Sequence, residues 1–456
     1  MRILHAVPAY HPEGPGGIEV YARALVRAQR ARGHEPIVLT GCAEIREQPT
    51  CESGEVDGVP VLRLYRDDLF AVHHAKAYHP GVEALVEEVL ARERPDLLHV
   101  HHWLRLTCNL VEIATRAGIP SVVTLHDAYT SCPRCWRVRP DLATCDRELS
   151  VESCSGCVPR WGCESDQEIA QGIRLFRAAY RHELTAASAV LAFSAATGEL
   201  VARATGLPGL HVRELRPGYE RHGREPRRAP PLPGPDEPFR FAHWGNLGRH
   251  KGTATLLRAV RLLVDRGPPR PFELHVFGPP ESVDFERELA GLAVGLPVVW
   301  HGRFAFPDLV RAAPHMGVLP SSAFETFSFA LAECFELGLP GVVTAVGALP
   351  QRVGDAGFVV TPNDPGELAH ALERVLADPT LRDRLAGAIP APPPTPDDHC
   401  AALEGVYATA RRDGTPAATP PVALREWALF LTRQRDSAQA RCCPPHDRPL
   451  PPTVGA

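Results

Sequence analysis

Alternating strand and helix patterns constrain the fold of this chain more than any other feature. In the first half, short apolar runs typical of buried strands alternate with amphipathic stretches typical of helices, from strand 2–7 and helix 18–32 to helix 169–185 and strand 189–193. A proline-rich stretch at 226–238 precedes a second series, with strands at 239–244, 273–277, 298–300, 316–320 and 341–344. We therefore expect an α/β protein with two doubly wound domains and a ligand between them.

The expected domain organisation follows from these patterns. Residues 1–215 form an N-terminal domain, 216–238 a linker and 239–390 a C-terminal domain. A last helix at 391–412 is expected to return to the first domain, and 413–456 forms a proline-rich, mostly disordered tail. Within that tail, a helical pattern at 422–435 indicates a segment that docks a partner.

Charge and hydropathy exclude several classes of function. The net charge is −5, and no basic block is present, so nucleic-acid binding is not expected. The sequence contains no uninterrupted apolar stretch of about eighteen residues, the length that a membrane span needs. The first residues have the pattern of a strand rather than that of a signal peptide. We expect a cytoplasmic protein.

Two glutamates, Glu325 and Glu333, flank the start of a predicted helix at 327–337 whose expected cap is Thr326. A helix N-terminus offers unpaired N–H groups and partial positive charge to an anion. A carboxylate beside it accepts hydrogen bonds from hydroxyls. The segment therefore predicts a site for a phosphorylated, hydroxyl-rich ligand.

A glycine-bracketed loop after strand 239–244 carries Lys251, one of two lysines among 49 basic residues. Because lysine is so scarce here, its place in such a loop is unlikely to reflect background usage. A compact ammonium suits a phosphate as a point charge. The loop is therefore predicted to hold a diphosphate.

These segments resemble the family 4 glycosyltransferases, which are retaining enzymes of the two-domain GT-B type, and the resemblance runs from residue 1 to about 410. The family's first glycine-rich loop is matched by Gly14-Pro-Gly-Gly17, and its strand-end histidine by His126 in Ser121-Val-Val-Thr-Leu-His-Asp127. Its Gly-Arg-Leu-x3-Lys-Gly loop is matched by Gly245-Asn-Leu-Gly-Arg-His-Lys-Gly252. The implied fold is two Rossmann-like domains that face each other across a cleft.

The resemblance implies a glycosyltransferase that moves a sugar from a nucleotide sugar to an acceptor hydroxyl with retention, as in polysaccharide biosynthesis. It implies catalytic roles for His126 at the reaction centre, Lys251 at the leaving diphosphate and Glu325 at the donor sugar. The implied donor-binding residues are Gly16, Gly17, Asn246, Arg249, Gly278, Phe304, Thr326, Phe327, Ser328 and Glu333. Glu333 is expected at the ribose, and Gly278 and Phe304 near the nucleobase.

One position departs from the family pattern, because Asn246 stands where the family has an arginine. We hypothesise that Arg249 replaces that arginine. The family implies UDP or GDP in the donor and a glycan, a lipid-linked molecule or a small molecule as acceptor. A lipid-linked acceptor would bring the protein into peripheral contact with the inner membrane face. No cofactor, and no divalent metal, is expected in catalysis.

A cysteine-rich insert at 130–165 is the second strong signal. It contains Cys132-x2-Cys135 and Cys154-x2-Cys157, two pairs separated by eighteen residues, together with Cys145 and Cys163. This spacing is typical of a structural zinc site with Cys132, Cys135, Cys154 and Cys157 as ligands. An iron–sulfur cluster, a redox switch and unligated thiols are the alternatives. Lasting disulfides are disfavoured in the cytoplasm.

Two other classes of function are compatible with these patterns. A sugar-nucleotide epimerase or hydrolase shares the two-domain fold. A non-catalytic or redox-sensing protein would work through its cysteine insert. The transferase is favoured because the Lys251 loop and the Glu325 segment follow its pattern in order along the chain.

Overall fold

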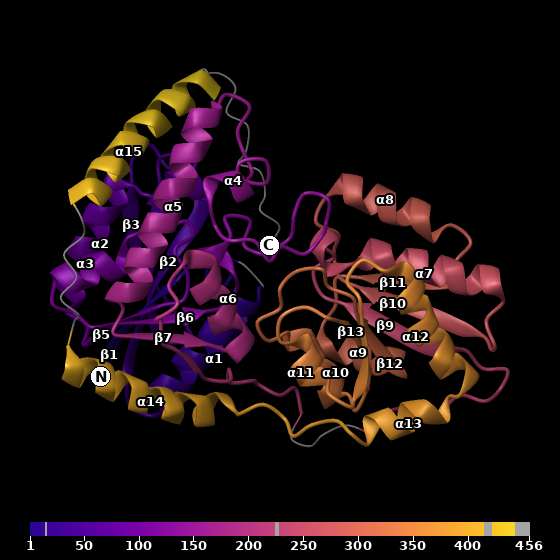
Figure 1. Cartoon of the computed structure of the whole chain (residues 1–456). Helices are drawn as coiled ribbons and strands as arrows, with labels where there is room; N and C mark the ends of the chain where they lie inside the picture. The colour runs from indigo at the N-terminus through magenta and orange to yellow at the C-terminus, as the bar shows by residue number, and fades with distance from the viewer. Residues whose placement is uncertain (14–15, 224–227, 415–421, 443–456) are drawn as a thin grey trace.

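The computed structural model describes residues 1–13, 16–223, 228–414 and 422–442. Two separate sheets organise the chain, as Figure 1 shows. The first has the order β3-β4-β2-β1-β5-β6-β7-β8 and the second the order β11-β10-β9-β12-β13-β14. The predicted fold class, two Rossmann-like α/β units, is confirmed.

The N-terminal sheet is parallel except where β3 and β4 pair as an antiparallel hairpin at one edge. Its strands are β1 (Arg2–Val7), β2 (Glu35–Ile45), β3 (Thr50–Val56), β4 (Val59–Arg66), β5 (Leu97–Val100), β6 (Ser121–Leu125), β7 (Ala189–Ala192) and β8 (Val212–Glu214). The accompanying helices are α1 (Gly17–Ala31), α2 (Pro80–Glu93), α3 (Leu110–Arg116), α4 (Val151–Cys154), α5 (Asp166–Ala186) and α6 (Ala195–Thr205), with short 3-10 turns η1 (His74–Lys76) and η2 (Tyr129–Ser131).

The C-terminal sheet is parallel throughout its printed pairings. Its strands are β9 (Phe239–Trp244), β10 (Phe272–Phe277), β11 (Val298–Gly302), β12 (Met316–Leu319), β13 (Gly341–Thr344) and β14 (Gly357–Val360). Its helices are α7 (Thr253–Arg266), α8 (Val283–Ala293), α9 (Phe306–Ala312), α10 (Phe329–Glu336), α11 (Leu349–Val353), α12 (Pro365–Ala377) and α13 (Thr380–Ala386), and the 3-10 turn η3 (Arg249–Lys251) precedes α7.

Apolar strands explain why helices cover both faces of each sheet. The central strands β5, β6, β12 and β13 are buried along their whole length. A parallel strand that is buried on both faces needs helices on either side. In each sheet the strand order reverses beside the first strand, between β1 and β5 and between β9 and β12. Ligands of such sheets bind outside the carboxyl ends of the strands at this point.

Two helices at the end of the described chain pack on the N-terminal unit. Helix α14 (Pro396–Asp413) lies against α1, with Tyr407 and Leu403 in a shared core with Leu25. Helix α15 (Val422–Cys442) runs beside α5 and η1 (Figure 1). The helix predicted at 422–435 therefore extends to Cys442 and contacts this chain's own N-terminal unit. Residues 415–421 and 443–456 of the predicted tail lie outside the described residues.

A buried ion pair attaches α15. Arg435 lies 3.1 Å from the carboxylate of Asp68, which also pairs with Arg66 at 2.8 Å. Ala438 of α15 packs against Leu69 and Phe70. Among the described helices, none combines the length and the apolar character that crossing a membrane requires.

We predict that Arg435→Ala lowers the free energy of unfolding of the N-terminal unit by about 1–3 kcal/mol, because it removes a buried charged hydrogen bond. Arg441→Ala is the matched control on the same helix. Its side chain is exposed and its pairing with Glu168 should contribute less than about 1 kcal/mol. Urea unfolding of both variants measures the difference, and equal losses would contradict the assignment.

Candidate active site

A cavity of about 840 Å³ lies between the two units and is lined by residues of both. It holds most of the residues that the sequence predicted. These are His126, Lys251, Glu325, Gly16, Gly17, Asn246, Phe304, Thr326, Phe327, Ser328 and Glu333. Gly14 and Pro15 of the first glycine-rich loop lie outside the described residues. The cavity is lined by residues that follow the carboxyl ends of β1, β6, β9 and β12.

Lys251 and Glu325 form an ion pair in this cavity, with 2.7 Å between Nζ and Oε1. The turn η3 after β9 positions the lysine, and the loop after β12 positions the glutamate. Burial by itself raises the pKa of Glu325, but the Lys251 ammonium outweighs burial and holds that pKa below its usual value. The pair therefore places one cation and one hydrogen-bond acceptor side by side.

Helix α10 points its N-terminus at the same cavity. Ser328 caps it, since its Oγ accepts a hydrogen bond from the backbone N–H of Leu331 at 3.4 Å. This corrects the prediction that Thr326 is the cap, and the helix begins at Phe329 rather than at Phe327. Ser328 reaches this place with a φ of 67°, which turns the chain sharply into the helix.

Thr326 connects the two units instead. Its hydroxyl donates a hydrogen bond to the backbone carbonyl of His126 at 2.6 Å. The loop after β12 is thereby held against the loop after β6. Sequence patterns gave no sign of this contact, because the two residues are 200 positions apart.

Glu333, about a turn into α10, accepts a hydrogen bond from the indole N–H of Trp244 at 2.8 Å. Burial raises the pKa of this glutamate. The sequence analysis missed Trp244. The available signal was a tryptophan at the last position of β9, directly before the loop that carries Lys251.

Two predicted donor-binding residues do not line the cavity. Arg249 turns toward α8, where it pairs with Glu288 at 2.5 Å and stacks over Phe285 at 4.5 Å. The hypothesis that it replaces the arginine missing at Asn246 is therefore not supported by its position. Besides Lys251, the basic residues that line the cavity are Arg221 and Arg303.

Gly278, directly after β10, is the second predicted donor-binding residue that does not line the cavity. Its φ is 124°, and a Cβ there would lie 1.7 Å from the carbonyl oxygen of Gly245. The ends of β9 and β10 approach this closely only without a side chain. Gly278 therefore shapes the Asn246 loop rather than the ligand surface.

His126 directly follows β6 and contacts Tyr21 and Phe193 edge-on. Its Nε2 lies 2.9 Å from Nδ1 of His101. Burial lowers the pKa of His126 to about 3. At neutral pH the ring therefore carries no charge, with one nitrogen that donates and one that accepts a hydrogen bond.

The cysteine insert reaches across to the C-terminal unit. Trp136 stacks on His250 with 4.1 Å between ring centroids, directly beside Lys251. The carbonyl of Trp136 accepts from the N–H of Phe324, and that of Leu142 accepts from Asn363 Nδ2 at 2.7 Å. The insert thus contacts the C-terminal unit next to the loop that carries Lys251.

The insert's thiols do not form a preformed tetrahedral site. Those that are free are Cys132, Cys135, Cys145, Cys154 and Cys157. Among the described residues, the groups of three metal-ligating atoms within 4.8 Å of one another are His5, His99 and His101, and Asp67, Asp68 and His79. Cys163 is disulfide-bonded, contrary to the expectation of reduced cysteines.

Two family models match the chain. Residues 16–218 match the glycosyl transferase 4-like domain, and residues 238–378 match the glycosyl transferases group 1. The D-inositol 3-phosphate glycosyltransferase of Arthrobacter sp. (strain FB24) is 26% identical over 399 residues, which are 83% of this chain and 86% of that protein. The Streptomyces griseus protein of the same name is 28% identical over 424 residues, covering 85% and 83%.

Solved structures share the fold. Sucrose-phosphate synthase from Thermosynechococcus elongatus superimposes with a TM-score of 0.58 at 19% identity, covering 96% of this chain and 99% of that one. Anabaena HepE in complex with UDP and glucose gives a TM-score of 0.55 at 19% identity, covering 91% and 98%. With both units matched by glycosyltransferase models and relatives aligned over most of its length, this chain belongs to the GT-B glycosyltransferases of the family 4 type.

Proposed function

We propose that the protein transfers a sugar from a nucleoside diphosphate sugar to an acceptor hydroxyl, with retention of the anomeric configuration. The observation that carries this proposal is the Lys251–Glu325 pair in a cavity that His126 lines from the opposite unit. The nearby N-terminus of α10 adds partial positive charge where a diphosphate would bind.

The chemistry calls for these groups. When the bond between the anomeric carbon and the phosphate oxygen breaks, negative charge grows on the diphosphate and positive charge on the sugar ring. Lys251 and the α10 N–H groups stabilise the first. Glu325 holds the sugar hydroxyls, and the leaving phosphate takes the proton of the acceptor hydroxyl as the new bond forms on the same face.

The comparisons support a nucleotide donor and a hydroxyl acceptor. HepE has been solved with UDP and with UDP-glucose, and the curated relatives are named for inositol 3-phosphate. We propose UDP or GDP as the carrier and a glycan, lipid-linked or small-molecule hydroxyl compound as the acceptor. A sugar-nucleotide hydrolase would release free sugar, and an epimerase would convert the donor, both without any acceptor.

We predict that UDP or GDP raises the melting temperature of the wild type and that Lys251→Met and Glu333→Gln abolish most of the shift. Arg249→Met is the matched control, because its cation belongs to the same loop but faces α8. A ligand at a hundredfold excess over its dissociation constant stabilises by about 2.7 kcal/mol, which differential scanning fluorimetry detects. A control variant that loses the shift as fully as Lys251→Met would argue against the proposed diphosphate site.

The ion pair predicts a pH-dependent stability. The folded pKa of Glu325 is lowered, so the pair stabilises the fold above the unfolded pKa of about 4.3 and loses this effect as pH falls. We expect Lys251→Met to cost about 1–2 kcal/mol at pH 7.5, a modest value because the Lys251 side chain is 37% exposed and water screens it. Unfolding titrations should show the difference shrinking below about pH 4.3. If Lys251→Met lowers the free energy of unfolding equally at pH 7.5 and below about pH 4.3, the ion pair is not the source of the loss.

Zinc binding by the insert stays a prediction from the cysteine spacing. Metal analysis of purified protein tests it, with Cys132→Ser and Cys157→Ser combined as the comparison. A stoichiometric ion that this double variant loses would support a structural zinc site. Metal-free wild type would contradict the structural zinc site.

A further inference from the structure

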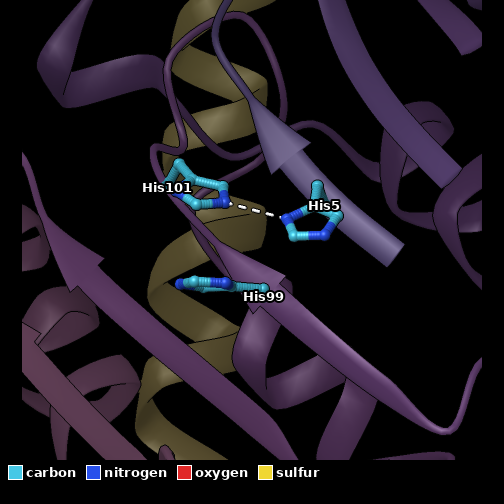
Figure 2. Close-up of side chains that lie close together, drawn as sticks. All are labelled: His5, His99 and His101. Carbon is cyan, nitrogen blue, oxygen red and sulfur yellow. Dashed lines mark hydrogen bonds between the residues drawn. The ribbon is translucent and has the colours of Figure 1, made fainter. Parts of the chain in front are cut away.

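Three histidines that the proposed reaction does not use lie together behind the cavity. His5 belongs to β1, His99 to β5, and His101 directly follows β5. All are buried, with exposed fractions of 0–1%. Figure 2 shows their rings grouped, with a hydrogen bond between His5 and His101.

Their hydrogen bonds identify the group as part of a hydrogen-bond network rather than a metal centre. The series Gln29, His5, His101 and His126 within this network is called the relay below. Both ring nitrogens of each histidine have a hydrogen-bond partner at 3.0 Å or less. A metal ion at their centre would have to break several of these bonds. Burial lowers the pKa of His5 to about 4 and that of His99 and His101 well below the usual value, so all three are neutral.

The relay leads to the active-site histidine. Gln29 Oε1 lies 2.7 Å from His5 Nε2, His5 Nδ1 lies 3.0 Å from His101 Nε2, and His101 Nδ1 lies 2.9 Å from His126 Nε2. A neutral imidazole has one N–H donor and one acceptor nitrogen. A ring that donates a hydrogen bond from one nitrogen must therefore accept one at the other, so the donor–acceptor direction is the same along the whole series.

The return helix α14 contacts the far end of the series. Gln29 donates its amide N–H to the hydroxyl of Tyr407 at 3.2 Å. The Tyr407 hydroxyl lies 2.7 Å from His99 Nδ1, and His99 Nε2 lies 2.7 Å from Thr124 Oγ1. With its nitrogen turned to Tyr407, Gln29 presents its oxygen to His5, and an oxygen of this kind only accepts.

The direction follows ring by ring. His5 carries its hydrogen on Nε2 and accepts at Nδ1, so His101 carries its hydrogen on Nε2 and accepts at Nδ1. His126 therefore donates from Nε2. Within the described residues, no hydrogen bond is found for Nδ1 of His126, which is the nitrogen left for a ligand in the cavity.

We propose that Gln29, His5 and His101 are positioning residues that fix His126 as the Nε2–H tautomer, so that Nδ1 accepts a hydrogen bond from a hydroxyl of the bound sugar or acceptor. This assignment rests on the proposed function. Reversing the relay would turn Nδ1 into a donor and misorient that hydroxyl, while leaving the shape of the cavity unchanged.

Two substitutions at Gln29 distinguish the effect of the hydrogen-bond direction in the relay from the effect of side-chain packing at this position. Gln29→Glu keeps an oxygen that accepts from His5, whereas Gln29→Met keeps the volume and removes the hydrogen bonds. If direction matters, Gln29→Met lowers kcat by roughly 10- to 100-fold, the effect of one well-placed hydrogen bond, with little change in the donor KM, and Gln29→Glu retains most of kcat. Val26→Ala, on the same helix, reports the effect of lost packing alone.

If the relay only fills space, burying a carboxylate is the worse change. Gln29→Glu would then be impaired as much as Gln29→Met or more, and the proposal would be overturned. UDP binding by all variants is measured in parallel, because it depends on the C-terminal unit and shows that the donor site is intact.

A measurement that does not depend on activity uses the ¹⁵N resonances of labelled histidines, with His126 assigned through His126→Gln. The Nε2–H tautomer of His126 in the wild type supports the relay, and the Nδ1–H tautomer refutes it. If the wild type binds UDP but transfers no sugar to any acceptor, the proposed function fails while this spectrum still decides the relay.

Discussion

The site depends on the contact that holds the carboxyl ends of two separate sheets against each other. Parallel strands deliver their following loops to one edge, so each sheet alone could offer only half of a binding surface. The hydrogen bond from Thr326 to the carbonyl of His126 joins the loop after β12 to the loop after β6. Trp136 on His250 adds a second contact, beside Lys251. These contacts place the ion pair within the same cavity as the strand-end histidine.

Sequence patterns predicted the fold class because burial of both sheet faces leaves a strong periodic signal. They also led to the residues of the cavity, since Lys251, Glu325 and His126 all follow strand ends. They could not predict where a side chain turns. Arg249, two positions before Lys251, leaves the cavity for Glu288 and Phe285, because a loop residue is free to pair with whichever helix lies nearest. Ser328 takes the capping role expected of Thr326 for a similar reason, since either side chain can cap a helix.

Contacts between distant segments had no local signal at all. Trp244 bonds Glu333 across 89 positions, and Tyr407 bonds His99 across 308. Hydrophobic periodicity predicts that such residues are buried, but not which buried groups meet. No sequence motif singles out the histidines of β1 and β5. Only their register in adjacent strands, with His5 directly opposite His99, places them in one network.

The histidine network also gives the return of α14 a meaning beyond packing. Neutral groups in a low-dielectric interior interact strongly, and a chain of them has two internally consistent directions. Nothing within β1, β5 and β6 selects between these directions, because imidazole can donate from either nitrogen. The amide of Gln29 is asymmetric and selects one by its orientation, with Oε1 toward His5 and the N–H toward Tyr407. Tyr407 belongs to α14, so the C-terminal helix that crosses back to the N-terminal unit takes part in the hydrogen-bond network behind His126.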